Sequence, residues 1–228
     1  MKTQLLIPAA GMGVRLGCEG PKALVELAGK PMIVRTLERL APLGLLDRAV
    51  IMTPPAWRGV FAGILHRAFP QIALTIEDGG SQRQDSVELG LALLDPDTEM
   101  VVIHDAARPF VPLESVTASI DAALACGAAT VAIPTTDTVL QGDRDGFLVD
   151  TPDRRYLWMC QTPQTFRVPV IRAAHAQARR DGYVGTDDAT LVRRTGAPVK
   201  LVMGSPANIK ITTPADLAWA AQFIREGM

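Results

Sequence analysis

The sequence predicts an α/β fold, in which a mostly parallel sheet is covered by helices on both faces and one β-hairpin projects as an arm. Three observations favour this fold class. Short apolar runs alternate with stretches of helical periodicity along nearly the whole chain. The apolar runs are almost continuous, which is typical of strands buried on both faces. The chain has 228 residues, of which 48% are hydrophobic and 21% charged, so one domain over residues 1–228 can bury a large core.

The strands and helices follow from these patterns in chain order. Six apolar runs predict strands, at Gln4–Ile7, Ala49–Met52, Ala73–Ile76, Met100–His104, Thr130–Ile133 and Val199–Met203. Between them, Pro31 opens a helix, and a final helix starts at Pro214. Three helical faces are apolar, and they carry Ile33, Leu37 and Leu40, then Val87, Leu91 and Leu94, then Val116, Ile120 and Leu124. Ligands of such sheets bind at the carboxyl ends of the strands.

One segment breaks this alternation and predicts the arm. Val139–Gln141 and Phe147–Val149 flank a turn that contains Asp143 and Gly146, which is typical of a β-hairpin. We place the arm at about residues 137–156. A two-stranded ribbon is marginally stable alone, so the arm is either a dimer contact or a simple surface hairpin.

Composition excludes several classes of protein. A net charge of −1 argues against a general nucleic-acid or anionic-membrane surface. The longest uncharged stretch, Ala122–Thr136, is too short to span a bilayer, and the N-terminus lacks a signal-peptide layout. The three cysteines show no Cys-x-x-Cys spacing, which indicates neither a zinc site nor a disulfide framework. We therefore expect a cytoplasmic protein.

A loop of small residues and two cations follows the first predicted strand. It runs Pro8-Ala9-Ala10-Gly11-Met12-Gly13 and continues to Arg15 and Lys22. Small residues let backbone N–H groups approach a polyanion, and two cations beside them suit a nucleoside triphosphate. Position 16 is Leu, so the dinucleotide fingerprint is incomplete, and Lys22 lacks the Walker context. A plain tight turn is the alternative.

A second cluster follows the third predicted strand. It contains Gly79 and Gly80, which permit close backbone approach, and Ser81 and Ser86, whose hydroxyls suit a base or ribose. Ser81 is equally suited to cap the N-terminus of the following helix. Both roles are compatible, because a helix N-terminus binds ligands with the same N–H groups.

A third and a fourth cluster supply further charged groups. Asp105 follows the fourth strand and is a natural Mg²⁺ ligand beside a triphosphate. Arg108 either holds a second phosphate as a bidentate fork or forms a structural pair with Asp105. We give His104 no role. Lys210 alternates with Ile209 and Ile211, so we place it on a strand, pointing away from the core.

Together these motifs resemble the 2-C-methyl-D-erythritol 4-phosphate cytidylyltransferase family. The matching residues are Pro8-Ala9-Ala10-Gly11-x-Gly13-x-Arg15, Pro21-Lys22, Gly79-Gly80-x-x-Arg83-x-x-Ser86-Val87, His104-Asp105-Ala106-Ala107-Arg108-Pro109 and Asn208-Ile209-Lys210-Ile211-Thr212. The resemblance covers nearly the whole chain with the motifs in order. It implies a Rossmann-like nucleotidyltransferase domain, Mg²⁺ as cofactor and a homodimer joined through the β-arm. The implied reaction transfers a cytidylyl group from CTP to methylerythritol phosphate in non-mevalonate isoprenoid synthesis and releases pyrophosphate.

The resemblance also implies a role for each matched residue. Phosphate binding and transition-state stabilisation fall to Arg15, Lys22 and Lys210. The nucleotide would be lined by Pro8, Ala9, Ala10, Gly11, Gly13, Gly80, Ser81, Ser86 and Ala106. The polyol phosphate would meet Asp105, Arg108, Arg154, Thr162, Thr186 and Thr212. Asp105 is also the candidate Mg²⁺ ligand, and Arg154 and Thr162 would reach the partner's substrate across the dimer.

Several alternatives stay open at this point. A ribitol-5-phosphate cytidylyltransferase shares most of these motifs, and a non-catalytic nucleotide-sensing module is the rival of another class. A nicotinamide dehydrogenase is disfavoured by the missing third glycine. We expect Arg154 rather than its neighbour Arg155 to enter the partner site. Asp187 and Asp188, beside Thr186, are either site residues or a charge pair at a helix N-terminus.

Overall fold

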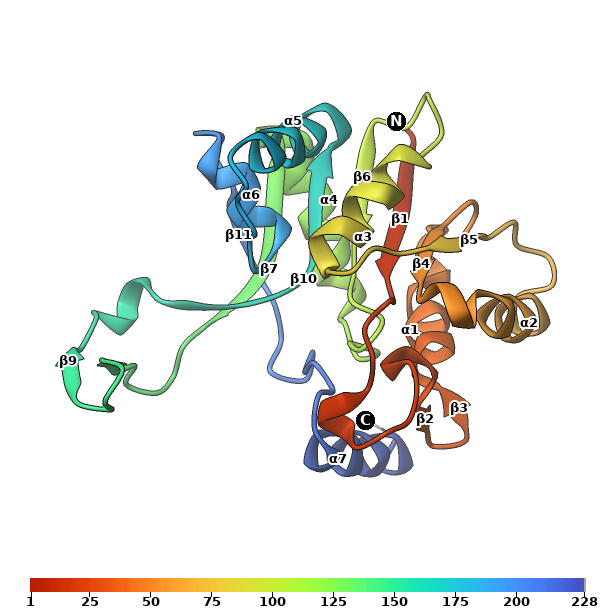
Figure 1. Ribbon diagram of the computed structural model, residues 1–228, viewed down its shortest axis with the longest axis horizontal. Coiled ribbons are helices and arrows are strands. Elements are labelled where there is room, and N and C mark those ends of the chain that lie inside the picture. The colour runs from red at the N-terminus through yellow and green to blue at the C-terminus, as the bar shows by residue number, and fades with distance from the viewer. Residues whose placement is uncertain (228) are drawn as a thin grey trace.

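The computed structural model describes residues 1–227 and contains a central seven-stranded sheet (Figure 1). The strands stand in the order β11-β7-β10-β6-β1-β4-β5. Their bounds are β1 Thr3–Pro8, β4 Val50–Thr53, β5 Thr75–Asp78, β6 Met100–Ile103, β7 Ala128–Pro134, β10 Trp158–Arg167 and β11 Lys200–Met203. All neighbouring pairs are parallel except those of β10, which is antiparallel to both β6 and β7. The mostly parallel α/β fold predicted from the sequence is confirmed.

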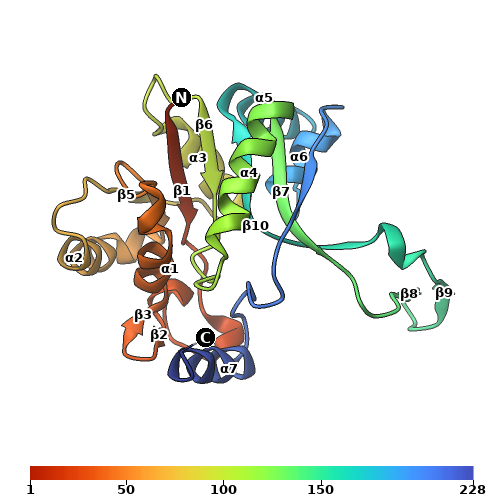
Figure 2. The same cartoon turned by 180° about the vertical axis from the view of Figure 1, so that it is seen from behind.

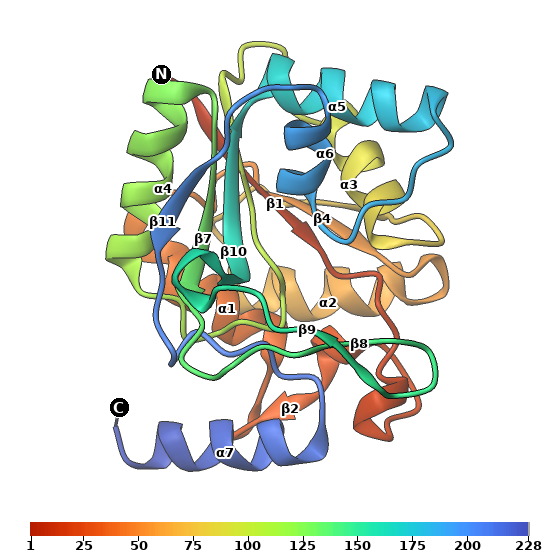
Figure 3. The same cartoon turned by 90° about the vertical axis from the view of Figure 1, so that its left-hand side faces the viewer.

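Helices cover both faces of this sheet (Figure 3). One face carries α1 (Met32–Leu40), α2 (Arg58–Ala68) and α4 (Leu113–Cys126), and the other carries α3 (Arg83–Ala92), α5 (Val168–Arg180) and α6 (Asp188–Arg194). A last helix, α7 (Pro214–Arg225), lies with the small β2–β3 hairpin (Glu26–Leu27 and Lys30–Pro31) near the carboxyl end of the sheet. Within residues 1–227 no helix combines the length and the apolar character needed to cross a bilayer.

The buried strand β1 shows why the apolar runs are continuous. Leu5 and Ile7 pack with α1 on one face of the sheet, while Leu6 packs with α3 and α5 on the other. None of these three side chains is exposed to solvent. Because both faces are covered, no position from Leu5 to Ile7 is left for a polar residue to face water.

The six predicted strands are present, with β5 shifted by two residues towards its carboxyl end. Strand β10 was not predicted, although it lies in the middle of the sheet. Its side chains Gln161, Thr162, Gln164 and Thr165 are polar yet buried, and they interrupt the apolar pattern. The segment around Lys210, in contrast, is not a strand and runs as irregular chain to the start of α7.

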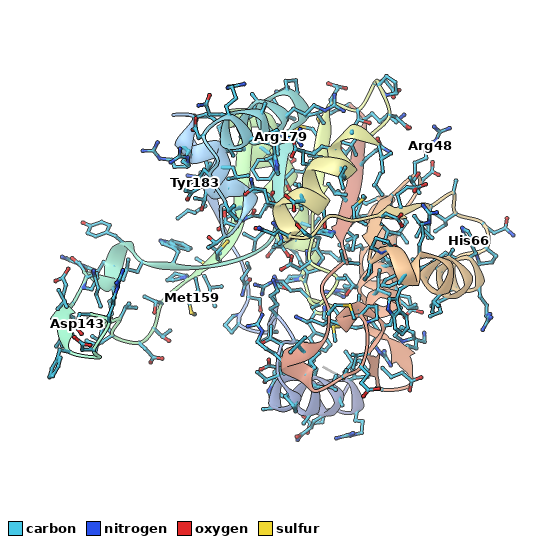
Figure 4. The ribbon with its side chains drawn as sticks, in the orientation of Figure 1. Arg48, His66, Asp143, Met159, Arg179 and Tyr183 are labelled. Carbon is cyan, nitrogen blue, oxygen red and sulfur yellow. The ribbon has the colours of Figure 1, made fainter. Side chains whose placement is uncertain are left out.

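The predicted hairpin is also present and projects from the body of the protein as an arm (Figure 2). It consists of β8 (Gln141–Gly142) and β9 (Leu148–Asp150), and a short 3-10 helix, Arg154–Tyr156, follows it. Met159 lies where the arm leaves the body and Asp143 lies at its far end (Figure 4). The Asp143 carboxylate accepts hydrogen bonds from the N–H groups of Asp145 and Phe147, which builds the turn.

Candidate active site

A pocket of about 290 Å³ opens at the carboxyl ends of the strands. The chain passes from β1 outward to β4 and β5 and then returns to the other side of β1 at β6, so the strand order reverses beside β1. Ligands of open α/β sheets bind at such a reversal. The pocket is lined by residues 8–12, 15, 22, 23, 80–83, 86, 105–107 and 210. Four separate segments therefore contribute to it.

The first loop is held in place by its own backbone. Ala9 N–H donates to the Met52 carbonyl at 2.7 Å, Lys22 N–H to the Gly11 carbonyl at 3.0 Å, and Gly13 N–H to the Gly20 carbonyl at 2.8 Å. A Cβ atom on Gly13 would lie only 3.2 Å from this Gly20 oxygen. Gly13 therefore shapes the loop from within. Gly13 is not among the residues that line the pocket, and its predicted contact with the nucleotide stays a prediction.

The second loop packs closely against the first. A Cβ atom on Gly79 would lie 2.7 Å from the Ala10 Cβ, so only glycine allows this approach. The Ser86 hydroxyl accepts from Gly80 N–H at 3.1 Å and donates to the Gln82 carbonyl at 3.0 Å. Gln82, not Ser81, is the N-cap of α3, in a capping box with Asp85. The predicted capping role of Ser81 is therefore wrong, because the helix begins one residue later.

Asp105 forms the centre of the charged groups. Its carboxylate lies 2.8 Å from Lys210 Nζ, 3.3 Å from Arg83 Nε and 3.7 Å from Arg108 Nε. Burial opposes ionisation of this carboxyl, but Arg83, Lys210 and Arg108 together hold its pKa far below the usual range. Asp105 is thus a carboxylate at any physiological pH.

The pocket nevertheless carries an excess of positive charge. Among its lining residues, Arg15, Lys22, Arg83 and Lys210 stand against the single carboxylate of Asp105. Burial, together with the nearby cations Lys210 and Arg15, lowers the pKa of Lys22 to about 8, although Asp105 opposes them. Like charges held close together and partly away from water are stabilised by an anion. The electrostatics therefore suit a polyphosphate.

His104 and Thr162 fix the backbone of Asp105. Asp105 N–H donates to Thr162 Oγ1 at 3.0 Å, and Thr162 Oγ1 lies 3.1 Å from His104 Nδ1. His104 Nε2 lies 3.0 Å from the Arg108 carbonyl, which can only accept, so Nε2 carries the proton and Nδ1 accepts from Thr162. Burial lowers the pKa of His104 to about 4, so this histidine is neutral at physiological pH.

Comparison with known proteins identifies the family. The family model of IspD, 2-C-methyl-D-erythritol 4-phosphate cytidylyltransferase, matches residues 3–226. The chain belongs to this family. It is therefore a nucleotidyltransferase of the cytidylyltransferase type, as the motifs of the first loop and of the Asp105 and Lys210 segments predicted.

Curated relatives and solved structures agree with this assignment. The 2-C-methyl-D-erythritol 4-phosphate cytidylyltransferase of Pelotomaculum thermopropionicum is 43% identical over 98% of this chain and 94% of its own length. That of Geobacillus kaustophilus is 41% identical over 100% of this chain and 99% of its own. The crystal structure of the Thermus thermophilus enzyme of that name matches with a TM-score of 0.81 at 33% identity, covering 99% and 100% of the two chains. The 4-diphosphocytidyl-2C-methyl-D-erythritol synthase of Anaerococcus prevotii matches with a TM-score of 0.85 at 29% identity, covering 98% of both chains.

The structure brings most of the predicted cytidylyltransferase residues into one pocket. The predicted residues that line it are Pro8, Ala9, Ala10, Gly11, Arg15, Lys22, Gly80, Ser81, Ser86, Asp105, Ala106 and Lys210. Lys210 is almost two hundred residues from Arg15 in the sequence, and an irregular segment rather than a strand carries it.

Other predicted residues lie outside the pocket. The Arg108 guanidinium donates to the Asn208 carbonyl at 2.6 Å and to the Cys160 carbonyl at 3.3 Å, so its terminal nitrogens do not form the free phosphate fork that we expected. The Thr212 hydroxyl donates to Asp216 at 2.8 Å, just before the first turn of α7. Both side chains hold loops together.

The residues predicted to act across a dimer are also separate from the pocket. Thr162 is a buried residue of β10 that accepts from Asp105 N–H in its own chain, and its predicted reach to the partner's substrate stays a prediction. Arg154 is exposed on the arm and donates to the Thr136 carbonyl at 2.9 Å, whereas Arg155 pairs with Asp153 at 2.6 Å. Thr186 is exposed on the loop before α6.

Sequence reasoning missed the role of Arg83, although it stood inside a quoted motif. Its guanidinium lines the pocket and bridges Asp105 and Asp188, and Nη1 lies 2.6 Å from the Asp188 carboxylate. Asp187 caps α6 and Asp188 is the first residue of that helix, so the predicted helix-terminal pair is present. An arginine at a helix start carries no signal of its own, because its partner lies 105 positions away in the sequence.

The donor set limits how a metal ion could bind. Among residues 1–227 no three His, Cys, Asp or Glu side chains come together in a way that could hold one. Mg²⁺ usually binds one or two carboxylates together with substrate phosphates and water. Asp105 alone fits that requirement, so the residues present suit Mg²⁺ that arrives bound to a triphosphate.

Proposed function

We propose that this pocket transfers the cytidylyl group of CTP to 2-C-methyl-D-erythritol 4-phosphate, with Mg²⁺ as cofactor, and that residues 1–228 form one nucleotidyltransferase domain. The products are 4-diphosphocytidyl-2-C-methyl-D-erythritol, an intermediate in isoprenoid precursor synthesis, and pyrophosphate. The observation that carries the proposal is the convergence of Arg15, Lys22 and Lys210 on a pocket whose one lining carboxylate is Asp105. Family membership supports the choice of reaction.

The reaction needs no general base from the protein. The second pKa of a phosphate monoester is near ~6, so the acceptor phosphate is largely a dianion at neutral pH. One of its oxygens attacks the α-phosphorus of CTP and forms a new P–O bond. The bond between the α-phosphorus and the bridging oxygen breaks, and its electron pair leaves with pyrophosphate. The buried neutral His104 takes no part in this proton balance.

The cations of the pocket would stabilise the negative charge that the reaction brings together. Two polyanions must come together, and negative charge accumulates on the oxygens around the α-phosphorus. Arg15 and Lys22 come from the first loop, and Lys210 comes from the segment before α7 and pairs with Asp105, so the three cations together would hold the triphosphate. Mg²⁺, held by Asp105 and phosphate oxygens, would neutralise further phosphate charge. Asp105 would also accept hydrogen bonds from the polyol hydroxyls.

The arm belongs to this proposal as the contact between two copies of the chain. Phe147, Leu148, Val149 and Tyr156 are all more than 60% exposed on the arm. A ribbon of two short strands with apolar residues in water is marginal, and pairing with a second copy would bury them. Arg154 would then reach the partner's acceptor site. A cytoplasmic location is supported by the cysteines, which are all unpaired.

Pyrophosphate release with CTP and Mg²⁺ over a panel of polyol phosphates tests this function. We expect turnover with 2-C-methyl-D-erythritol 4-phosphate, and none with ribitol 5-phosphate or without Mg²⁺. Replacing CTP by UTP in a parallel series measures base selection. Lys22→Ala should lose about 10²–10³ in kcat, whereas Lys30→Ala, which removes an exposed lysine paired with Glu38, should not.

Two results would overturn the proposal. Turnover confined to ribitol 5-phosphate would change the acceptor, although the named relatives above do not favour it. CTP binding in calorimetry without turnover on any acceptor would make the chain a nucleotide-sensing module.

A further inference from the structure

Arg83 lies between two buried carboxylates and is bound unequally by them. Its Nη1 lies 2.6 Å from Asp188, whereas its Nε lies 3.3 Å from Asp105. Nη2 is buried and has no hydrogen-bond partner among the described residues. An arginine beside a carboxylate ordinarily binds it through two parallel N–H groups. Arg83 forms no such fork with Asp105, although it is within reach.

Two further hydrogen bonds hold Asp188 in place. Its other carboxylate oxygen accepts from His175 Nε2 at 3.1 Å, and its backbone N–H donates to Gln164 Oε1 at 2.9 Å. The side chain is only 1% exposed. These contacts come from α5 and β10, so two elements of the body fix the position of Asp188 at the start of α6.

The same helix that carries Arg83 also holds the loop before Asp188. Gln84 Nε2 donates to the Tyr183 carbonyl at 3.1 Å, and its Oε1 accepts from Gly185 N–H at 2.8 Å. Tyr183 marks this loop in Figure 4. Arg83 and Gln84 therefore connect the loop that contains Thr186 to the pocket lining. In this connection Asp188 is the residue that binds Arg83.

We propose that Asp188 is a positioning residue, which holds the Arg83 guanidinium back from Asp105 so that the Asp105 carboxylate stays available to the acceptor polyol. The inference rests on the proposed function, which places the acceptor at Asp105. Without the Asp188 charge, Asp105 becomes the strongest partner of Arg83. The guanidinium then closes on Asp105 as a bidentate fork and occupies the oxygens that the acceptor hydroxyls need.

Asp188→Asn tests this with almost no change in shape. His175 Nε2–H requires an acceptor, so the amide oxygen of the new asparagine faces His175. Its NH₂ group then turns towards Arg83 and repels the guanidinium, because both groups are hydrogen-bond donors. We expect the KM for the acceptor to rise about tenfold, the equivalent of one charge-assisted hydrogen bond. The Kd for CTP measured in calorimetry without Mg²⁺ should stay within about twofold, because Arg15, Lys22 and Lys210, which we assign to its phosphates, are unchanged.

Two further variants separate positioning from mere stability. Arg83→Met in the Asp188→Asn background removes the guanidinium that blocks Asp105. The acceptor KM of this double variant should therefore be at least about threefold lower than that of Asp188→Asn. Asp188→Glu keeps the charge, and its acceptor KM should lie closer to that of the unmodified enzyme than the KM of Asp188→Asn does. A structural role predicts the reverse order, because a longer side chain overpacks this buried site more than an isosteric amide does.

The matched control removes another ion pair of α3, which this helix forms with α5 instead of α6. Arg179 on α5, labelled in Figure 4, pairs with Glu88 on α3 at 2.6 Å, away from the pocket lining. Arg179→Gln should leave both the acceptor KM and the Kd for CTP without Mg²⁺ unchanged. An acceptor KM that stays normal in Asp188→Asn, or a double variant no better than the single one, overturns the inference. An unmodified enzyme without turnover on the acceptor would instead overturn the proposed function.

Discussion

Replacing Lys22 with arginine should remove the alkaline limb of the pH profile for CTP. Burial and the nearby cations lower the pKa of Lys22 to about 8, so the free enzyme loses this charge as pH rises through that value. The kcat/KM for CTP reports groups of the free enzyme and should fall above about pH 8. An arginine stays protonated up to about pH 12, so the Lys22→Arg profile should stay level through the same range.

The size of the effect follows from that pKa. With a value of about 8, roughly nine-tenths of Lys22 is protonated at about pH 7 and roughly one-tenth at about pH 9. The kcat/KM for CTP should therefore drop about tenfold between these two pH values. A bound triphosphate stabilises the ammonium and raises its pKa. The limb of kcat should consequently lie at higher pH than the limb of kcat/KM.

The assay is pyrophosphate release at constant ionic strength, because salt screens these charges. Measurements should stay above about pH 6.5, where the acceptor phosphate keeps its dianionic form. Lys30→Arg, a change at an exposed lysine, should keep the limb of the unmodified enzyme. A level profile in the unmodified enzyme, or the same limb in Lys22→Arg, would refute the electrostatic account of Lys22.

Three more predictions concern the loops, the fold and the arm. Gly79→Ala should raise the KM for CTP in steady-state assays, because the new Cβ would lie 2.7 Å from Ala10 and push it towards the pocket; an unchanged KM would mean that the loops can separate freely. His104 has its pKa lowered to about 4 in the folded chain, below its unfolded value, so its contribution to stability is complete above pH 6.5 and is lost as pH falls towards 4. Between about pH 7 and pH 5, the free energy of unfolding measured in urea should fall by about 2 kcal/mol less in His104→Gln than in the unmodified protein. Equal decreases in the two proteins would contradict the buried neutral histidine. If Arg154 acts on the partner's site, mixing inactive Lys22→Ala chains with inactive Arg154→Ala chains should restore activity to about a quarter of the sites. After subunit exchange half of the dimers are mixed, and each mixed dimer has one intact site. No recovery of activity after confirmed subunit exchange would show that Arg154 does not act on the partner's site.

The sequence could predict the site because parallel strands bring their carboxyl ends to one edge. The loops after β1, β5 and β6 are far apart in the chain, but strand order makes them neighbours. Small residues and charges placed just after apolar runs therefore predicted the pocket. The local patterns do not reveal the role of Arg83, because that role depends on a carboxylate that only the folded chain brings near.

Strand β10 shows where pattern reasoning fails. Its buried side chains Thr162 and Gln164 bind other buried groups, since Thr162 accepts from Asp105 N–H and Gln164 accepts from Asp188 N–H. Buried polar groups are tolerated when they are hydrogen-bonded in this way. The polar residues that hid the strand from prediction are thus the ones that hold Asp105 and Asp188 in place.

The position of Lys210 depends on a small separate core. Ile211 N–H donates to the Ala107 carbonyl at 2.9 Å, and Ile211 and Ala107 are buried with Leu16 of the first loop and Ala220 of α7. This core links the segments that carry Lys210, Asp105 and Arg15. Burial of a charge and repulsion from neighbouring cations both cost stability, and both lower the pKa of Lys22. Burial of apolar side chains in this core offsets the repulsion in the free protein, so a bound triphosphate meets cations that are already in place and still repel one another.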